Sequence, residues 1–262
     1  MSSTNHPNSG ISILFLISRL VACILLTLSA IGCAGDKQNL IYDTFILGIT
    51  SPNTVIDEAK LNQNYRYLKV EANGQPALLA LGYVDQKKQS KHDVWFSAFK
   101  EVVEIKDGRL GNTEGLEVNW TEVSLFDAPP LRAALALNID AGDKAKQKSA
   151  KLRYMRIRSV MPGYHVNIRE TVVMEALTEI PIDIPKQLKD PIANENIRWI
   201  QETVLVPPNN FNPSIKPLRA IYAINIKTNE TVFGKQYLTP DFFVSWLTWP
   251  YPAPSKDNQP TK

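Results

Sequence analysis

The stretch from Tyr65 to Gly115 constrains the fold most, because short extended runs alternate there with turn dipeptides. Tyr67–Glu71 is extended and is followed by Asn73-Gly74, which favours a tight hairpin because both turn residues must tolerate positive φ. Ala77–Val84 is an apolar run of strand length, and Asp107-Gly108 marks another turn. This stretch therefore predicts a twisted antiparallel sheet, and by itself it indicates no chemistry.

The following chain continues the same pattern. Leu116, Val118 and Trp120 alternate with polar residues, and the parity changes at Glu122, where we expect a β-bulge. Leu218–Lys227 and Thr231–Leu238 predict a later hairpin. We predict an all-β fold, mostly antiparallel, that is either a β-sandwich or a partly open β-barrel. A few short helices are expected, at 54–60 and 131–137.

Length and charge limit the class of protein. The 262 residues suffice for one large β domain or two small ones, and 18 prolines against 12 glycines suit a β protein rich in loops. The net charge of +3 is too balanced to indicate a nucleic-acid partner. Three prolines in Ile180–Asn194 indicate a crossing loop; a domain boundary there is the alternative to the single domain that we favour.

The N-terminal segment has the form of a lipoprotein signal peptide. The apolar core Leu20–Ala30 is too short to span a bilayer, and small residues precede Cys33, as in a lipobox. We predict that Cys33 is lipidated and anchors the protein in a lipid bilayer. An uncleaved anchor helix from Ile11 is the alternative, although Arg19 interrupts it. Ala34 in place of an aspartate favours the outer membrane, with the body facing the periplasm.

These boundaries divide the chain into four parts. Residues 1–32 are the predicted signal peptide, 33–39 a lipidated tether, 40–249 one β-rich domain, and 250–262 a proline-rich tail that is disordered or polyproline-like. The other cysteine, Cys23, falls in the removed part, so the mature protein has no thiol pair. Disulfides, thiolate metal clusters and Cys–His catalysis are thereby excluded, and we expect neither metal nor cofactor.

An ordered set of residues resembles a known family. The set reads Asn73, Gly74, Pro76, Leu81, Gly82, Tyr83, Trp95, Ser97, Ala98, Gly108, Arg109, Leu110, Gly115 and Leu116. Asp127-x-Pro-Pro-Leu-Arg and Ile226–Thr239 also fit. The pattern is similar to the YjbF/GfcB-type lipoproteins encoded with capsule and exopolysaccharide export genes. The resemblance implies a non-catalytic accessory role in capsule or exopolysaccharide assembly or export.

Catalytic groups are hard to find in the sequence. His92 lies in a polar stretch with no partner spaced nearby, and His165 begins a strand on its outer parity, so both are expected at the surface. The carboxylate pairs Glu101/Glu104 and Glu117/Glu122 fall on solvent-facing positions, unlike the facing pair of a glycosidase. We therefore predict no catalytic residues.

Two clusters are candidates for binding. Lys151, Arg153, Arg156 and Arg158 would all face one side if a bulge lay between Tyr154 and Met155, and could then meet an acidic glycan. A solvated strand face is the alternative. Near the C-terminus an aromatic run could stack on sugars or contact a partner, or could instead plug the β core; it consists of Phe242, Phe243, Trp246 and Trp249. Trp95, Trp120 and Trp199 are assigned to the core.

The expected partners are the polysaccharide or its export proteins, bound through a sheet face or the aromatic end. Two other functions remain open at this point. A lipid or lipoprotein chaperone would need a hollow half-barrel with a large apolar pocket. A polysaccharide-modifying enzyme would need convergent carboxylates in a cleft. The oligomeric state is not indicated.

Overall fold

The computed structural model describes residues 53–87, 90–136, 151–205 and 217–251. Twelve strands in these residues form one antiparallel sheet, and the helical elements among them are short. The predicted all-β class is therefore confirmed, in its barrel form. The helical elements are α3 (Asn53–Glu58), α4 (Ala133–Ala136) and the 3₁₀ turn η2 (Lys186–Leu188). The first two lie where short helices were expected.

The strands follow one another along the chain. They are β1 (Tyr67–Ala72), β2 (Gln75–Lys87), β3 (Ser90–Phe96), β4 (Val102–Lys106), β5 (Arg109–Glu114), β6 (Asn119–Phe126), β7 (Leu152–Met161), β8 (His165–Leu177), β9 (Ile197–Val204), β10 (Arg219–Asn225), β11 (Glu230–Thr239) and β12 (Phe242–Trp249).

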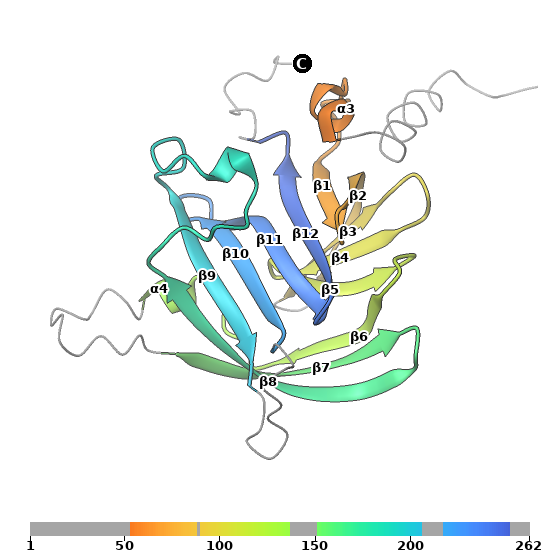
Figure 1. Cartoon of the computed structure of the whole chain (residues 1–262), viewed down its shortest axis with the longest axis vertical. Coiled ribbons are helices and arrows are strands. Elements are labelled where there is room, and N and C mark those ends of the chain that lie inside the picture. The colour runs from red at the N-terminus through yellow and green to blue at the C-terminus, as the bar shows by residue number, and fades with distance from the viewer. Residues whose placement is uncertain (1–52, 88–89, 137–150, 206–216, 252–262) are drawn as a thin grey trace, which may run out of the picture. The chain divides into compact units, whose positions relative to one another are not determined.

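The sheet rolls into a barrel that is nearly closed (Figure 1). Each strand pairs with its neighbours in sequence, except that β5 does not pair with β6, and the first strand, β1, pairs with the last, β12. The two sheet edges are therefore β5 and β6, which are consecutive in the chain. Side chains join them: the Trp120 N–H donates to Thr113 Oγ1 and the Val123 N–H to Asn112 Oδ1, each at 3.0 Å. We call this junction the seam.

The turns form where the sequence predicted them. Asn73 and Gly74 have φ of 48° and 90° between β1 and β2, and Asp107 and Gly108 have 50° and 80° between β4 and β5. The predicted bulge is also present: Glu122 has φ of 55°, and the register of β6 against β7 shifts between Thr121 and Ser124.

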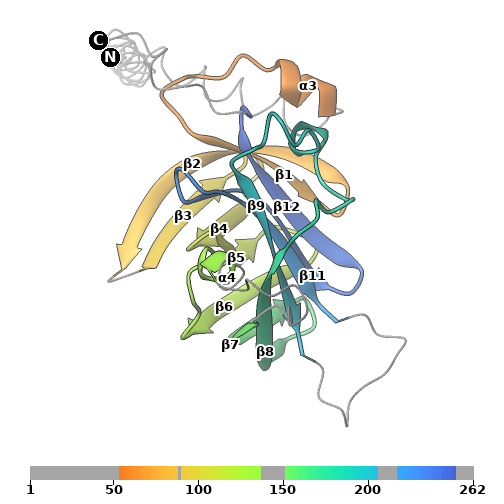
Figure 2. The same ribbon diagram turned by 90° about the vertical axis from the view of Figure 1, so that its left-hand side faces the viewer.

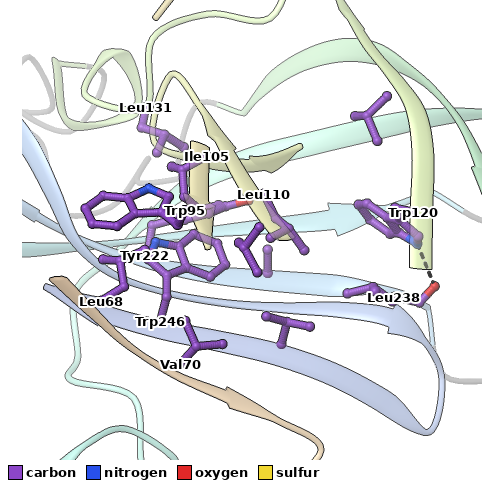
Figure 3. Packing of buried hydrophobic residues seen from close by; sticks show 14 of the residues in the cluster. Leu68, Val70, Trp95, Ile105, Leu110, Trp120, Leu131, Tyr222, Leu238 and Trp246 are labelled. Atoms are coloured by element: carbon purple, nitrogen blue, oxygen red, sulfur yellow. Dashed lines mark hydrogen bonds between the residues drawn. The ribbon is translucent and has the colours of Figure 1, made fainter. Parts of the chain in front are cut away.

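Side chains fill the barrel interior (Figure 3). Trp120, Trp246 and Tyr222 are among the largest fully buried side chains, and the Trp120 indole N–H donates to the carbonyl of Leu238 at 3.0 Å. Gly234 on β11 lies under Trp246, because a Cβ there would come within 2.1 Å of the indole ring. Trp95 also packs in this interior cluster, as expected.

A second apolar layer lies on the outside of the sheet. The segment 178–196, which contains η2, places Ile184 and Leu188 against Trp199, Phe233 and Leu247. This confirms that Trp199 is a core residue, although in the outer layer. Figure 2 shows η2 and α3 at the same end of the sheet, where β12 finishes.

Candidate functional site

The predicted anchor falls outside the described residues, and so does the predicted tail except for Pro250 and Tyr251. Tyr251 packs against the outer apolar layer and donates a hydrogen bond to Asn194, so the tail begins after it. Cys33 is not among the described residues, so its lipidation stays a prediction. In the ranges that the structure describes, no helix is long and apolar enough to cross a membrane.

The basic strand does not present four cations on one side. β7 keeps its register with β8 through Tyr154 and Met155, and the register shifts instead between Arg158 and Val160. Arg156 and Arg158, which are 3% and 5% exposed, point into the barrel because their parity is that of the buried Tyr154. The prediction of a bulge at Tyr154 was therefore wrong, and with it the prediction of a shared face.

The two remaining cations of this set lie at the surface. Arg153 is exposed, on the opposite parity to the buried arginines. Lys151 precedes β7, and its ammonium lies 2.8 Å from a carboxylate oxygen of Glu175. The strand thus offers isolated outer cations rather than an anion-binding surface, and whether they bind a glycan remains a prediction.

The inward arginines form a buried ionic cluster with Glu170. Arg156 Nη2 lies 2.7 Å from Glu170 Oε2 and Arg158 Nη2 lies 2.6 Å from Glu170 Oε1. Both guanidinium groups stack on Trp120, at 4.5 and 4.7 Å from the ring centroid. Burial alone would raise the pKa of Glu170, but the hydrogen bond from Arg158 and the charges of both arginines lower it below its usual value.

A second buried network surrounds Glu202. Its carboxylate accepts hydrogen bonds from Arg109 Nε at 2.8 Å, from the Tyr154 hydroxyl at 3.0 Å and from the Tyr222 hydroxyl at 3.1 Å. Burial and the neighbouring Glu202 charge raise the pKa of Tyr154 and Tyr222 above the usual value for tyrosine, so both hydroxyls stay protonated donors. Arg109 also donates to the Pro129 carbonyl at 2.8 Å, which ties the segment before α4 to the barrel.

The aromatic run does not form one surface either. Phe242 and Trp246 point inward and belong to the interior cluster. Phe243 and Trp249 lie on the opposite parity of β12 and are partly buried on the outside. The prediction that all four residues form one patch is therefore wrong. The alternative, that the run fills the β core, holds for Phe242 and Trp246.

Phe243 lines a groove on the outer face, with a volume of about 390 Å³, between α3 and the segment of η2. Lys235 is 7% exposed there, pairs with Asp183, and lies 4.1 Å from the Phe243 ring centroid. Lys69 borders the same groove and lies 2.6 Å from Asp57 and 5.0 Å from the Trp249 ring. Both lysines are therefore already held by carboxylates.

His92 is not the free surface residue that we expected. It lies on β3 with a side chain 11% exposed, and its Nδ1 contacts Glu104 on β4. Strand pairing made this contact, which spacing along the chain could not indicate. The pair lines a hollow of about 570 Å³. His165, in contrast, is exposed at the start of β8 as expected.

The carboxylates do not converge in the way that a glycosidase requires. Glu101 accepts a hydrogen bond from Ser97, Glu104 also accepts from the Asn112 side chain at 2.6 Å, and Glu122 accepts from Ser159 at 2.8 Å. Each is held by a different neighbour. Within the described residues, no group of histidine, cysteine, aspartate and glutamate is placed to hold a metal ion.

A large hollow lies at one end of the barrel and has a volume of about 950 Å³. We call it the end cavity. Its walls come from the β4–β5 and β10–β11 turns, the start of β3 and the segment before α4, and thirteen of its twenty lining residues are polar or charged. Asp93 lines it and is 9% exposed. No pattern along the chain indicated this site, because its walls are far apart in sequence.

The comparisons with known proteins agree with this barrel. The model of the family described as "Group 4 capsule polysaccharide lipoprotein gfcB, YjbF" matches residues 47–207, which is more than half of the chain. The chain belongs to this family. The match runs from ahead of α3 to just beyond β9, and so includes both inward arginines and Glu202.

A solved structure supports the fold of this YjbF-family chain. The crystal structure of the hypothetical lipoprotein YmcC from Escherichia coli K12 is similar, with a TM-score of 0.51 and 18% identity, over 73% of this chain and 90% of that one. At that identity the likeness shows the fold alone. No curated protein matches the chain.

Proposed function

We propose that this protein is a non-catalytic lipoprotein of the outer membrane that faces the periplasm. It assists the assembly or export of capsule or another exopolysaccharide by binding the polymer or a protein of the export machinery. Membership of the group 4 capsule lipoprotein family carries the proposal. The hollows support a binding role, since charged and polar side chains line them and could contact a hydroxylated polymer.

The geometry favours this role over a lipid chaperone. Such a chaperone would need a large apolar pocket, whereas Trp120, Trp246 and Tyr222 fill the middle of this barrel and nine charged side chains line the end cavity. An enzyme is also disfavoured, because Glu101, Glu104 and Glu122 are each held by a separate neighbour and Glu117 is exposed.

A deletion strain tests the proposal. Polysaccharide of high molecular weight would be measured separately at the cell surface and in the periplasm. We expect loss of the polymer at the surface and recovery when the wild-type gene is restored. An unchanged amount at the surface would contradict the proposed role.

Anchoring provides a second test. Replacing the acceptor thiol, Cys33→Ala, should abolish incorporation of labelled palmitate, because the sulfur carries the acyl group. Cys23→Ala is the matched control and should leave labelling unchanged, since Cys23 lies in the predicted signal peptide. Labelling that persists in Cys33→Ala would show that this cysteine is not the anchor.

A further inference from the structure

Two buried polar atoms on β3 lack partners within the described ranges, one on Asp93 in the wall of the end cavity and one on Trp95 behind that wall. Asp93 Oδ2 lies 2.9 Å from Lys91 Nζ, but Asp93 Oδ1 is buried and has no hydrogen-bond partner among the described residues. The indole N–H of Trp95, two residues along β3, is also buried without a partner in this part of the chain. A buried donor or acceptor left unsatisfied costs about 1–3 kcal/mol, so this pair of atoms needs an explanation.

Both groups belong to the cavity side of β3. Asp93 lines the cavity directly. Trp95 has the same strand parity, and Figure 3 shows its ring beside Ile105 and Leu131, which line the cavity as well. The Arg66 guanidinium, another lining group, lies 5.7 Å from the Trp95 ring centroid. The acceptor and the cation therefore belong to the cavity wall, and the Trp95 donor lies directly behind that wall, in the interior cluster.

The spacing of these groups indicates the size and chemistry of a ligand. Alternate residues of a strand are about 6.8 Å apart, which is too far for one small polar group to serve both. A pyranose ring carries several hydroxyls around its edge, and each hydroxyl both donates and accepts. The volume of about 950 Å³ is within the range of sites for small ligands.

The charges around the cavity fit a sugar better than a lipid. Its cations are Arg66, Lys91, Lys106, Arg109 and Arg132, and its acids are Asp93, Asp107, Asp127 and Glu230. Such a nearly balanced set suits a ligand with many hydroxyls, and it would be costly to cover with an acyl chain.

We propose that the end cavity binds one or a few pyranose residues of a polysaccharide. A ring hydroxyl donates to Asp93 Oδ1, and another accepts from the indole N–H of Trp95. This inference rests on the proposed function, because it takes the bound polymer as the ligand.

The test is direct binding to the full-length lipoprotein in detergent micelles. The probe is the oligosaccharide mixture released by mild acid from the extracellular polysaccharide of the strain that carries the gene. We expect Asp93→Leu to weaken binding about tenfold, because a charge-assisted hydrogen bond is lost, and Trp95→Phe about fivefold. Asp241→Leu, an exposed aspartate between β11 and β12, is the control and should bind as the wild type does.

Stability separates a binding role from a structural one. Asp93→Leu removes the unsatisfied Oδ1 together with a partly exposed ion pair to Lys91 that contributes little to stability, so the melting temperature should change little while affinity falls. Trp95→Phe removes the N–H but keeps an aromatic ring at this position, so it stays informative if Asp93→Leu does not fold. Three results would overturn the inference. They are an affinity of both β3 variants equal to that of the wild type, a loss of affinity in Asp241→Leu as large as in Asp93→Leu, and no binding by the wild type.

The deletion strain distinguishes this inference from the proposed function. Loss of surface polymer in that strain, with no oligosaccharide bound by the wild-type protein, would leave the proposed function standing and remove the end cavity as its site. Binding that depends on Asp93 and Trp95, with surface polymer unchanged in the deletion strain, would keep the cavity and remove the proposed role in export.

Discussion

Glu170 is the residue on which the interior depends most directly. It is 8% exposed and is the carboxylate bonded to both inward arginines. Replacement by glutamine would leave Arg156 and Arg158 buried without a counter-charge. Removing one partner of a buried ion pair typically costs about 3–5 kcal/mol.

We therefore expect Glu170→Gln to lower the free energy of unfolding by about 3–5 kcal/mol at neutral pH, as measured by urea unfolding with tryptophan fluorescence. Glu195→Gln is the matched control: Glu195 lies 3.9 Å from Lys227, both side chains are well exposed, and an exposed pair contributes about 0–1 kcal/mol. Equal stability of the two variants would contradict the role given to Glu170.

Because the pKa of Glu170 is lowered in the folded state, the stability that Glu170 contributes depends on pH in a known direction. The unfolded carboxyl has a pKa of about 4.3, and the folded one titrates below that value. The stabilisation is thus complete above about pH 4.3 and is lost as the pH falls through the folded pKa. The difference in stability between wild type and Glu170→Gln should shrink over this acidic range, and a constant difference would show that Glu170 is not the titrating group.

Several single residues were predictable and others were not. The inward place of Glu170 could have been found, since it shares the parity of Ile168, Val172 and Met174 on an alternating strand. Asp93 and His92 could not, because their surroundings are made by strands and turns that the local sequence does not bring together.

At the scale of elements, the seam is the weakest junction of the sheet. β5 and β6 meet through the side chains of Asn112 and Thr113, whereas the other strands are joined by backbone ladders. When a side chain is the hydrogen-bond acceptor of an edge amide, removing that side chain lowers the protection of the amide against hydrogen exchange.

Asn112→Ala combined with Thr113→Val should therefore speed hydrogen exchange at the amides of Trp120 and Val123. The measurement is exchange resolved by residue, with β8 and β9 as internal references. Thr171→Val on β8 is the control and should leave these two amides unchanged, because the Thr171 backbone pairs with Met155 on one side and accepts from the Leu205 N–H on the other. Unaltered exchange in the double variant would mean that other contacts hold the seam.

Among the elements, the hairpins were predictable and one strand face was not. Asn73-Gly74, Asp107-Gly108 and the bulge at Glu122 all formed where local chemistry placed them. The outward face predicted for the cations of β7 was wrong, because it required a bulge between Tyr154 and Met155 and the register does not shift there. Arg156 and Arg158 can lie inside the barrel because both donate hydrogen bonds to Glu170, a buried carboxylate on the neighbouring strand.

At the scale of the whole barrel, the seam also separates two halves of the chain. β1–β5 and β6–β12 are joined by the short connection 115–118, by six residue pairs between β1 and β12, and by a shared core. The pairing of β1 with β12 could not be predicted, because the register of strands far apart in sequence leaves no local mark.

This arrangement predicts that the barrel survives a break at the seam. A protease site inserted between Glu117 and Val118 should, after cleavage, give two fragments that elute together in native size-exclusion chromatography and separate in denaturant. The same site in the β10–β11 turn, after Lys227, is the comparison: cleavage there leaves β10 and β11 hydrogen-bonded in their ladder, so those fragments should also elute together. Fragments that separate under native conditions after cleavage at the seam would show that the connection itself holds the halves.

The pairing of the first strand with the last also sets the order in which the molecule can be completed. Tyr67 meets Trp249, so β1 keeps an open edge until nearly the whole chain has been made. Early strands form hairpins at once, but closing the ring requires contacts between the two ends, which are slow to form. During synthesis or export from the N-terminus, the unpaired edge of β1 is therefore open to pairing with other chains until β12 covers it.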